Sequence, residues 1–107
     1  DVGTVVNIDR VKSQFEGAMI FGTSIALYSE ITVNDGVVAQ GNFDGYRLTR
    51  MNESPEIKIT IVESSAQPRG VGEPGVPPVA PAIINAIAAA GGPRIRDLPA
   101  INHVDIV

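Results

Sequence analysis

The uncharged run from Pro74 to Pro93 is the feature that most constrains how this chain can fold. Residues 79–90 within it are apolar on nearly every side of a helix, and Gly91-Gly92-Pro93 ends that helix sharply. At about twelve residues the helix is too short to cross a bilayer, so it has to be buried in protein. A chain of 107 residues has little material with which to surround it. We therefore expect neighbours outside this chain, although a partly exposed alanine-rich helix stays open as the alternative.

The first part of the chain predicts a strand and then a long helix. Residues 1–6 form a short apolar run. Asn7 or Asp9 then offers an N-cap for a helix over roughly residues 9–28. One apolar stripe at helical spacing comprises Val11, Phe15, Ala18, Met19, Gly22, Ile25 and Ala26.

Two glycines, Gly17 and Gly22, interrupt this predicted helix. Glycine costs about 1 kcal/mol in a helix interior. We therefore expect another backbone or a ligand to approach the helix closely at these positions.

The middle of the chain predicts a hairpin and a further strand. Residues 30–33 and 37–40 flank Asn34-Asp35-Gly36, a three-residue connection with glycine available for the left-handed position of a bulged hairpin. Residues 41–56 are polar and irregular, which suggests an insertion at the sheet edge. In residues 57–62 isoleucine alternates with lysine and threonine, as in a half-buried strand.

Together these elements predict a small α+β fold over residues 1–107, treated as a single domain. We expect a mostly antiparallel sheet of three or four strands with two helices packed on one face. The net charge of −4 and the lack of a basic run argue against nucleic acid or an anionic membrane as a partner. With no cysteine and a single histidine, His103, we predict no metal-ligating residues in this chain.

The glycine-rich loop Gly70-Val71-Gly72-Glu73-Pro74-Gly75-Val76 places one carboxylate between glycines. Proline after Glu73 favours an extended conformation, so the side chain should project from the loop outside the following helix. The helix N-terminus should face the loop and favour a nearby anion. The spacing also matches a dinucleotide fingerprint, but residues 64–69 separate the loop from the preceding strand, which argues against that interpretation. A plain solvated loop is the remaining alternative.

Six stretches in one order resemble a known family. They are Val5-Val6-Asn7, Gln14 to Gly22, Asn42-Phe43, Met51 to Ile57, Gly70 to Pro78, and Arg94-Ile95-Arg96-Asp97-Leu98-Pro99. Together they are similar to the C-terminal end of the molybdenum-binding large subunit of the xanthine dehydrogenase and aldehyde oxidase family, with isoquinoline 1-oxidoreductase as the most similar type. The chain begins at Asp1 without an initiator methionine, and we expect a piece of a larger molybdenum-binding domain.

The resemblance implies specific roles for residues of this chain. The glutamate that matches Glu73 acts as a general base beside molybdenum. Gly70, Val71 and Gly72 would then lie against molybdopterin, in its cytosine dinucleotide form, and Gln14 matches a position near the cofactor. The interpretation of Gln14 as an exposed polar residue of the first helix stays open.

By the same resemblance, the partners would be the remainder of the large subunit and an iron–sulfur subunit, and the substrate would be an aldehyde or a nitrogen heterocycle. We expect the isolated chain to hold no cofactor and to be inactive. An alternative of another class is a small non-enzymatic module that binds proteins through the apolar helix 79–90. The sequence distinguishes neither the substrates from one another nor a cytoplasmic from a periplasmic location.

Overall fold

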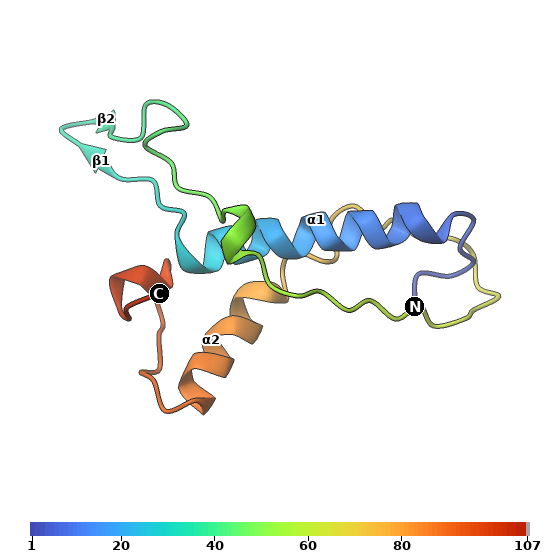
Figure 1. Ribbon diagram of the computed structural model, residues 1–107. Coiled ribbons are helices and arrows are strands. Elements are labelled where there is room, and N and C mark those ends of the chain that lie inside the picture. The colour runs from blue at the N-terminus through green and yellow to red at the C-terminus, as the bar shows by residue number, and fades with distance from the viewer. Residues whose placement is uncertain (107) are drawn as a thin grey trace.

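The computed structural model describes residues 1–106 and is built on one long helix, α1, which spans Ile8–Leu27 (Figure 1). The helix begins at Asn7, whose side-chain oxygen accepts a hydrogen bond from the backbone N–H of Arg10 at 3.0 Å. It ends at Tyr28, which is buried. The predicted helix over residues 9–28 is therefore confirmed to within one residue at each end.

The predicted apolar stripe of α1 is the face that packs against the rest of the chain. Its buried positions carry small side chains, and sequence reasoning did not include two of them, Thr23 and Ser24. Their hydroxyls donate to the carbonyls of Met19 and Ile20, one turn earlier, at 2.8 and 3.1 Å. The buried set on α1 is Ala18, Gly22, Thr23, Ser24 and Ala26.

The second helix, α2, spans Val79–Ala89 and crosses α1 at Gly22. A Cβ added at Gly22 would lie 2.7 Å from the Cβ of Val79, which only glycine allows. The close approach that was expected at Gly22 is therefore confirmed. At Gly17, by contrast, no described atom outside its own stretch of α1 lies within 4 Å of such a Cβ.

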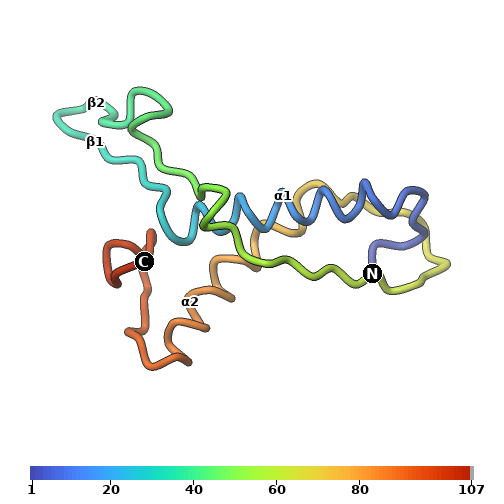
Figure 2. Tube along the Cα trace, in the orientation of Figure 1, coloured from blue at the N-terminus to red at the C-terminus, as the bar shows by residue number. Residues whose placement is uncertain are grey.

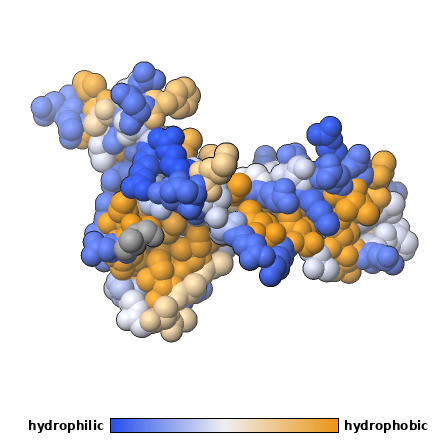
Figure 3. Space-filling model, in the orientation of Figure 1, coloured by the Kyte–Doolittle hydropathy of each residue, from blue (hydrophilic) through white to orange (hydrophobic). Residues whose placement is uncertain are grey.

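Within the described residues α2 is only partly covered, so its burial by neighbours outside this chain stays a prediction. None of its residues is fully buried, because only one side meets α1. Figure 3 shows apolar atoms exposed over α2. Since alanine tolerates exposure, the alternative of a partly exposed helix also stays open.

The hairpin forms, but with a shorter connection than predicted. Strands β1 (Val33–Asn34) and β2 (Val37–Val38) pair antiparallel with Val33 opposite Val38 and Asn34 opposite Val37. The turn is therefore Asp35-Gly36 alone, and both residues have positive φ, 50° and 80°. Two consecutive positive φ angles are the requirement of a type I′ turn, so no bulge is needed.

The two other predicted strands are not part of a sheet, and within residues 1–106 the sheet has two strands rather than three or four. Residues 1–6 pair only at isolated points: Thr4 N–H donates to Ala66 O, and Arg69 N–H donates to Val2 O, each at 2.9 Å. Residues 57–62 are extended and keep the predicted alternation of burial, but they have no neighbouring strand. Figure 2 shows this segment running from η1 toward the N-terminus, away from the hairpin. The predicted α+β class with two helices is nevertheless confirmed.

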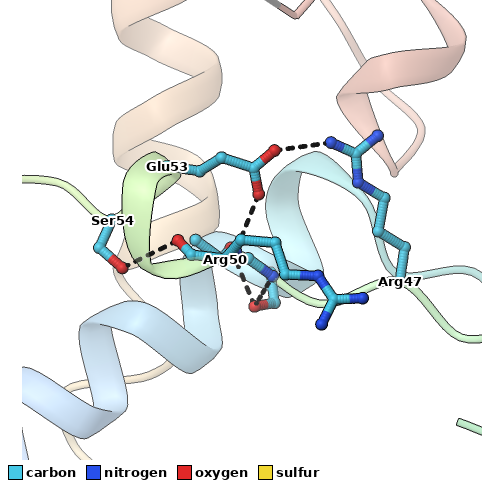
Figure 4. A network of polar contacts seen from close by, with 6 residues as sticks. Arg47, Arg50, Glu53 and Ser54 are labelled. Carbon is cyan, nitrogen blue, oxygen red and sulfur yellow. Dashed lines mark hydrogen bonds and ion pairs between the residues drawn. The ribbon is translucent and has the colours of Figure 1, made fainter.

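The predicted irregular stretch 41–56 contains a short 3₁₀ helix, η1 (Met51–Glu53), and is held on the end of α1 by polar contacts. Arg47 stacks on the ring of Tyr28 at 4.0 Å and forms an ion pair of 2.7 Å with Glu53. Figure 4 shows the other carboxylate oxygen of Glu53 accepting from the backbone N–H of Arg50, at 2.8 Å. Nearby, Thr49 N–H donates to the Ser24 hydroxyl at 3.0 Å.

The last segment folds back on α1. A second 3₁₀ helix, η2 (Ala100–Asn102), contacts the long helix, and Ile95, Pro99 and Ala100 are buried with it. The chain as a whole is extended, measuring 53 × 35 × 25 Å. Its radius of gyration of 16.5 Å exceeds the roughly 13 Å expected of a compact domain of this length. Much apolar surface therefore stays uncovered.

The helix crossing gives a first prediction. Gly22→Ala should lower the free energy of unfolding by about 1–3 kcal/mol, because the added methyl group forces Val79 and α2 away from α1. Gly17→Ala is the matched control, since nothing lies within 4 Å of its Cβ and alanine gains up to about 1 kcal/mol of helix propensity. Denaturant unfolding of both variants tests this, and equal stability of the two would contradict the crossing.

The Glu53 contacts give a second prediction, on pH. The backbone N–H of Arg50, with the Arg47 guanidinium, holds the pKa of Glu53 below its ordinary value of 4.5. A lowered pKa means that the ionised carboxylate stabilises the fold above pH 4.5 and that this stability is lost as the pH falls through the lowered pKa. Glu53→Gln should therefore lower the Tm near neutral pH, with a difference that shrinks in acid.

Glu56→Gln is the control for this series, because Glu56 pairs only with the exposed Lys58. Its Tm should follow that of the wild type at each pH. Thermal melts between neutral and strongly acid pH measure both variants. A Glu53→Gln effect that stays constant over the whole range would show that the charge of Glu53 is not what stabilises this stretch.

Candidate functional site

A hollow of about 370 Å³ lies between one face of α1 and the turn that precedes α2. The contribution of α1 follows from helical spacing, since residues 14, 17, 18 and 21 share one face. The turn contributes Gly72, Glu73 and Val76. The full lining is Gln14, Gly17, Ala18, Phe21, Gly72, Glu73 and Val76.

Gly75 holds the turn against α1. A Cβ added at Gly75 would lie 2.8 Å from the Cβ of Ala18 and 3.0 Å from Cδ1 of Phe15. The turn is closed by the backbone N–H of Val76, which donates to the carbonyl of Glu73 at 2.9 Å. Glu73 is therefore placed beside α1 by backbone packing rather than by a contact of its own side chain.

The hollow combines one acidic and one amide side chain. Glu73 and Gln14 are both exposed, and Glu73 is the single charged residue of the lining. The Nε2 atom of Gln14 lies 3.9 Å from the position of a Cβ at Gly72, so a side chain there would narrow the space between the two groups. A carboxylate can accept a proton, and a carboxamide can both donate and accept hydrogen bonds.

Glu73 lies outside the helix, as predicted, because α2 begins only at Val79. The expectation that the N-terminus of α2 favours an anion finds little support. Pro78 and Pro81 lack an N–H, and the N–H of Val79 donates to the carbonyl of Val76 at 3.2 Å. The proline-rich entry to α2 therefore leaves few free amides for a ligand.

The predicted site residues separate into two groups in the structure. Gln14, Gly72 and Glu73 come together at the hollow, although Gln14 and Gly72 are 58 positions apart in sequence. Gly70 is exposed with no atom within 4 Å of an added Cβ, and Val71 is half-buried. Neither Gly70 nor Val71 lines the hollow.

Sequence reasoning missed Phe21 and Val76 as lining residues and Gly75 as the residue that seats the turn. Phe21 is 53% exposed, which is unusual for an aromatic side chain next to a buried helix face. The sequence did contain a signal for Phe21: it lies seven residues after Gln14, and that spacing places both side chains on the same helix face.

Two further findings concern the described part of the chain. Residues 1–106 contain no cluster of three or more histidine, cysteine, aspartate or glutamate side chains that could hold a metal ion. Across the same residues, neither α1 nor α2 has the length and apolar character needed to span a bilayer.

Comparison with known proteins identifies relatives over nearly the whole chain. The beta subunit of the isoquinoline 1-oxidoreductase of Brevundimonas diminuta is 41% identical over 92% of this chain. The membrane-bound aldehyde dehydrogenase (pyrroloquinoline-quinone) of Gluconacetobacter polyoxogenes is 40% identical over the same share, and a nicotinate dehydrogenase subunit of Pseudomonas putida is 35% identical. Xanthine dehydrogenase molybdenum-binding subunits of Escherichia coli are also similar, at 33% identity.

This chain spans only a small part of those proteins. It covers 13% of the length of the first two and 8% of the third. The resemblance stated from the ordered motifs is confirmed by these relatives. The model of the molybdopterin cofactor-binding domain matches residues 1–55, about half of the 107 residues, and the chain belongs to that family.

Proposed function

We propose that residues 1–107 are a single domain at the C-terminal end of the large subunit of a molybdenum hydroxylase, and that Glu73 is the general base of its active site. Such an enzyme hydroxylates an aldehyde or a nitrogen heterocycle with oxygen derived from water. The observation that carries this proposal is the meeting of Glu73 with Gln14 across one hollow, although the two lie on different elements. Family membership supplies the cofactor class.

The residues of the hollow fit one wall of a molybdopterin site. Gly17 and Gly72 leave open space on the two sides of it, so a flat ring system could approach the backbone closely. Gln14 offers hydrogen bonds of both kinds to a heterocycle. No lysine or arginine lines the hollow, so cations for the phosphate of the cofactor have to come from outside these residues.

The name of one relative includes pyrroloquinoline-quinone. The proposal of molybdopterin rests instead on the family model and on the relatives named as molybdenum-binding subunits. We propose the cytosine dinucleotide form on the motif resemblance. In this proposal Gly70 and Val71 also lie against the cofactor, next to Gly72.

Glu73 performs proton transfer in this proposal. The bound cofactor supplies Lewis-acid and redox chemistry. A carboxylate oxygen of Glu73 would accept the proton that water loses as its oxygen bonds to the substrate carbon, while the hydrogen of that carbon leaves with the two electrons that the redox chemistry of the cofactor would take up. Gly75 positions the base by fixing the turn on α1, and Gln14 orients the cofactor from the opposite side of the hollow.

Partners follow from how little of the site this chain contains. The hollow is shallow and open, and the apolar face of α2 is uncovered, so the remainder of the large subunit would complete the substrate pocket. Several relatives are named as subunits, which supports a multi-subunit assembly. We propose that one partner is an iron–sulfur subunit that accepts the electrons, and that the isolated chain is inactive.

The proposal is tested by Glu73→Gln in the assembled enzyme. Glutamine keeps the shape of glutamate but cannot accept the proton, so kcat should fall on the order of 10²–10⁴-fold while molybdenum and pterin contents stay unchanged. Glu16→Gln is the matched control, because Glu16 is an exposed carboxylate of α1 that does not line the hollow. Wild-type turnover in Glu73→Gln would sink the assignment.

The uncovered face of α2 favours a second candidate function, a non-enzymatic module that binds another protein. An apolar groove of about 580 Å³ lies between α1, residues 53–58 and α2, and Ile83 lies in its wall. If this groove is the functional surface, Ile83→Glu should abolish association and Glu73→Gln should be silent, because a buried charge opposes docking. Ala86→Glu, at an exposed position outside the groove, controls for the added charge.

Co-purification of partner chains with each variant measures this fourth prediction. Loss of partners with Ile83→Glu together with normal turnover in Glu73→Gln would favour the binding module. Loss of turnover in Glu73→Gln with all partners retained would favour the hydroxylase.

A further inference from the structure

Residues 55–63 form an extended segment whose backbone has no hydrogen-bond partner among residues 1–106. The last backbone bond before it is donated by Ser54 to Met51 O, and the next contact is at Ser64, whose carbonyl accepts from the Thr4 hydroxyl. Backbone N–H and C=O groups in folded proteins are nearly always paired or hydrated. A long row of backbone N–H and C=O groups without protein partners is therefore an exposed strand edge.

The side chains of this segment already have the pattern of a sheet strand. Ile57, Ile59 and Ile61 are half-buried, whereas Lys58 and Thr60 are exposed. Ile57 lines the apolar groove beside α2, and Ile61 lies in a second hollow beside the N-terminal turn. One face of the segment is thus fixed against the chain, and its register is set before any partner is added.

No other part of the described chain is placed to pair with residues 56–62. The N-terminal residues pair with the chain only at Ala66 and Arg69, and by Ile8 they have turned into α1. The hairpin β1–β2 lies at the other end of the molecule (Figure 2). A strand partner therefore has to come from outside residues 1–106.

We propose that residues 56–62 accept a β-strand along one edge from the remainder of the same large subunit, so that this segment becomes part of a larger sheet. The inference rests on the proposed function, in which this chain is the C-terminal part of a longer polypeptide. The relatives support that source, because the chain covers only 8–13% of their length. The added strand should carry apolar side chains at alternate positions, to continue the face of Ile57, Ile59 and Ile61.

Amide hydrogen exchange of the assembled enzyme tests the pairing. Successive N–H groups of a strand point to opposite sides, so one added strand should protect every second amide within residues 56–62. These amides should exchange at least about 100-fold more slowly than unpaired amides, as hydrogen-bonded strands do. The exposed residues Asn42 and Asp44, whose N–H groups donate no hydrogen bond within the described chain, are the internal reference for fast exchange. Fast exchange of all amides in residues 56–62 would overturn the proposal.

A photo-crosslinking residue in place of Thr60 identifies the source of the strand. Thr60 is exposed on the unpaired segment, and a crosslinker in place of the exposed Ser65 is the matched control. We expect a crosslink from position 60 to an extended segment of the same polypeptide. A crosslink to a second copy or to a different subunit would overturn the proposal.

These readouts are independent of turnover. Protection of residues 56–62 with normal activity of Glu73→Gln would support the strand pairing and contradict the general-base role of Glu73. Fast exchange of residues 56–62 together with an inactive Glu73→Gln would contradict the strand pairing and support the general-base role.

Discussion

The close contact between the backbone of Gly22 and the side chain of Val79 is what the rest of the structure depends on, together with a second contact of the same kind at Gly75. At each contact the glycine has no side chain, so its backbone packs directly against the opposite residue. This close packing fixes the positions of the turn and α2 relative to α1. Glu73 comes just before the two contact residues Gly75 and Val79 in sequence, so these contacts fix its position relative to α1. The candidate site is therefore a consequence of helix packing and not of polar contacts at the site itself.

Both helices could be predicted from the sequence because their signals are local. Asn7 caps α1, an apolar stripe defines its inward face, and prolines and glycines bound α2. The hairpin was predicted for the right residues, but the turn was not, since its length depends on whether Asn34 pairs with Val37. Pairing is a tertiary property that spacing alone does not fix.

The site divides in the same way. Glu73 and Gln14 were singled out as residues before the structure brought them together, whereas Phe21 and Gly75 became visible only from the packing. The predicted strand over residues 57–62 has no sheet partner within this chain, and the burial of α2 by neighbours outside the chain stays a prediction. The outer face of α2 and the backbone edge of residues 57–62 have no partner among the described residues. Both patterns are those of surfaces that pack against other parts of a protein.

The two glycines of α1 show how one residue type serves two purposes. Gly22 costs the helix about 1 kcal/mol and is explained by Val79, which occupies the space of its missing side chain. Gly17 carries the same cost, but outside its own stretch of α1 no described atom lies within 4 Å of a Cβ added there, and it faces the hollow shared by Gln14 and Glu73. A glycine kept in a helix without a protein neighbour suggests that its space is used by something outside the chain. On the proposed function, that occupant is the cofactor against which Glu73 works.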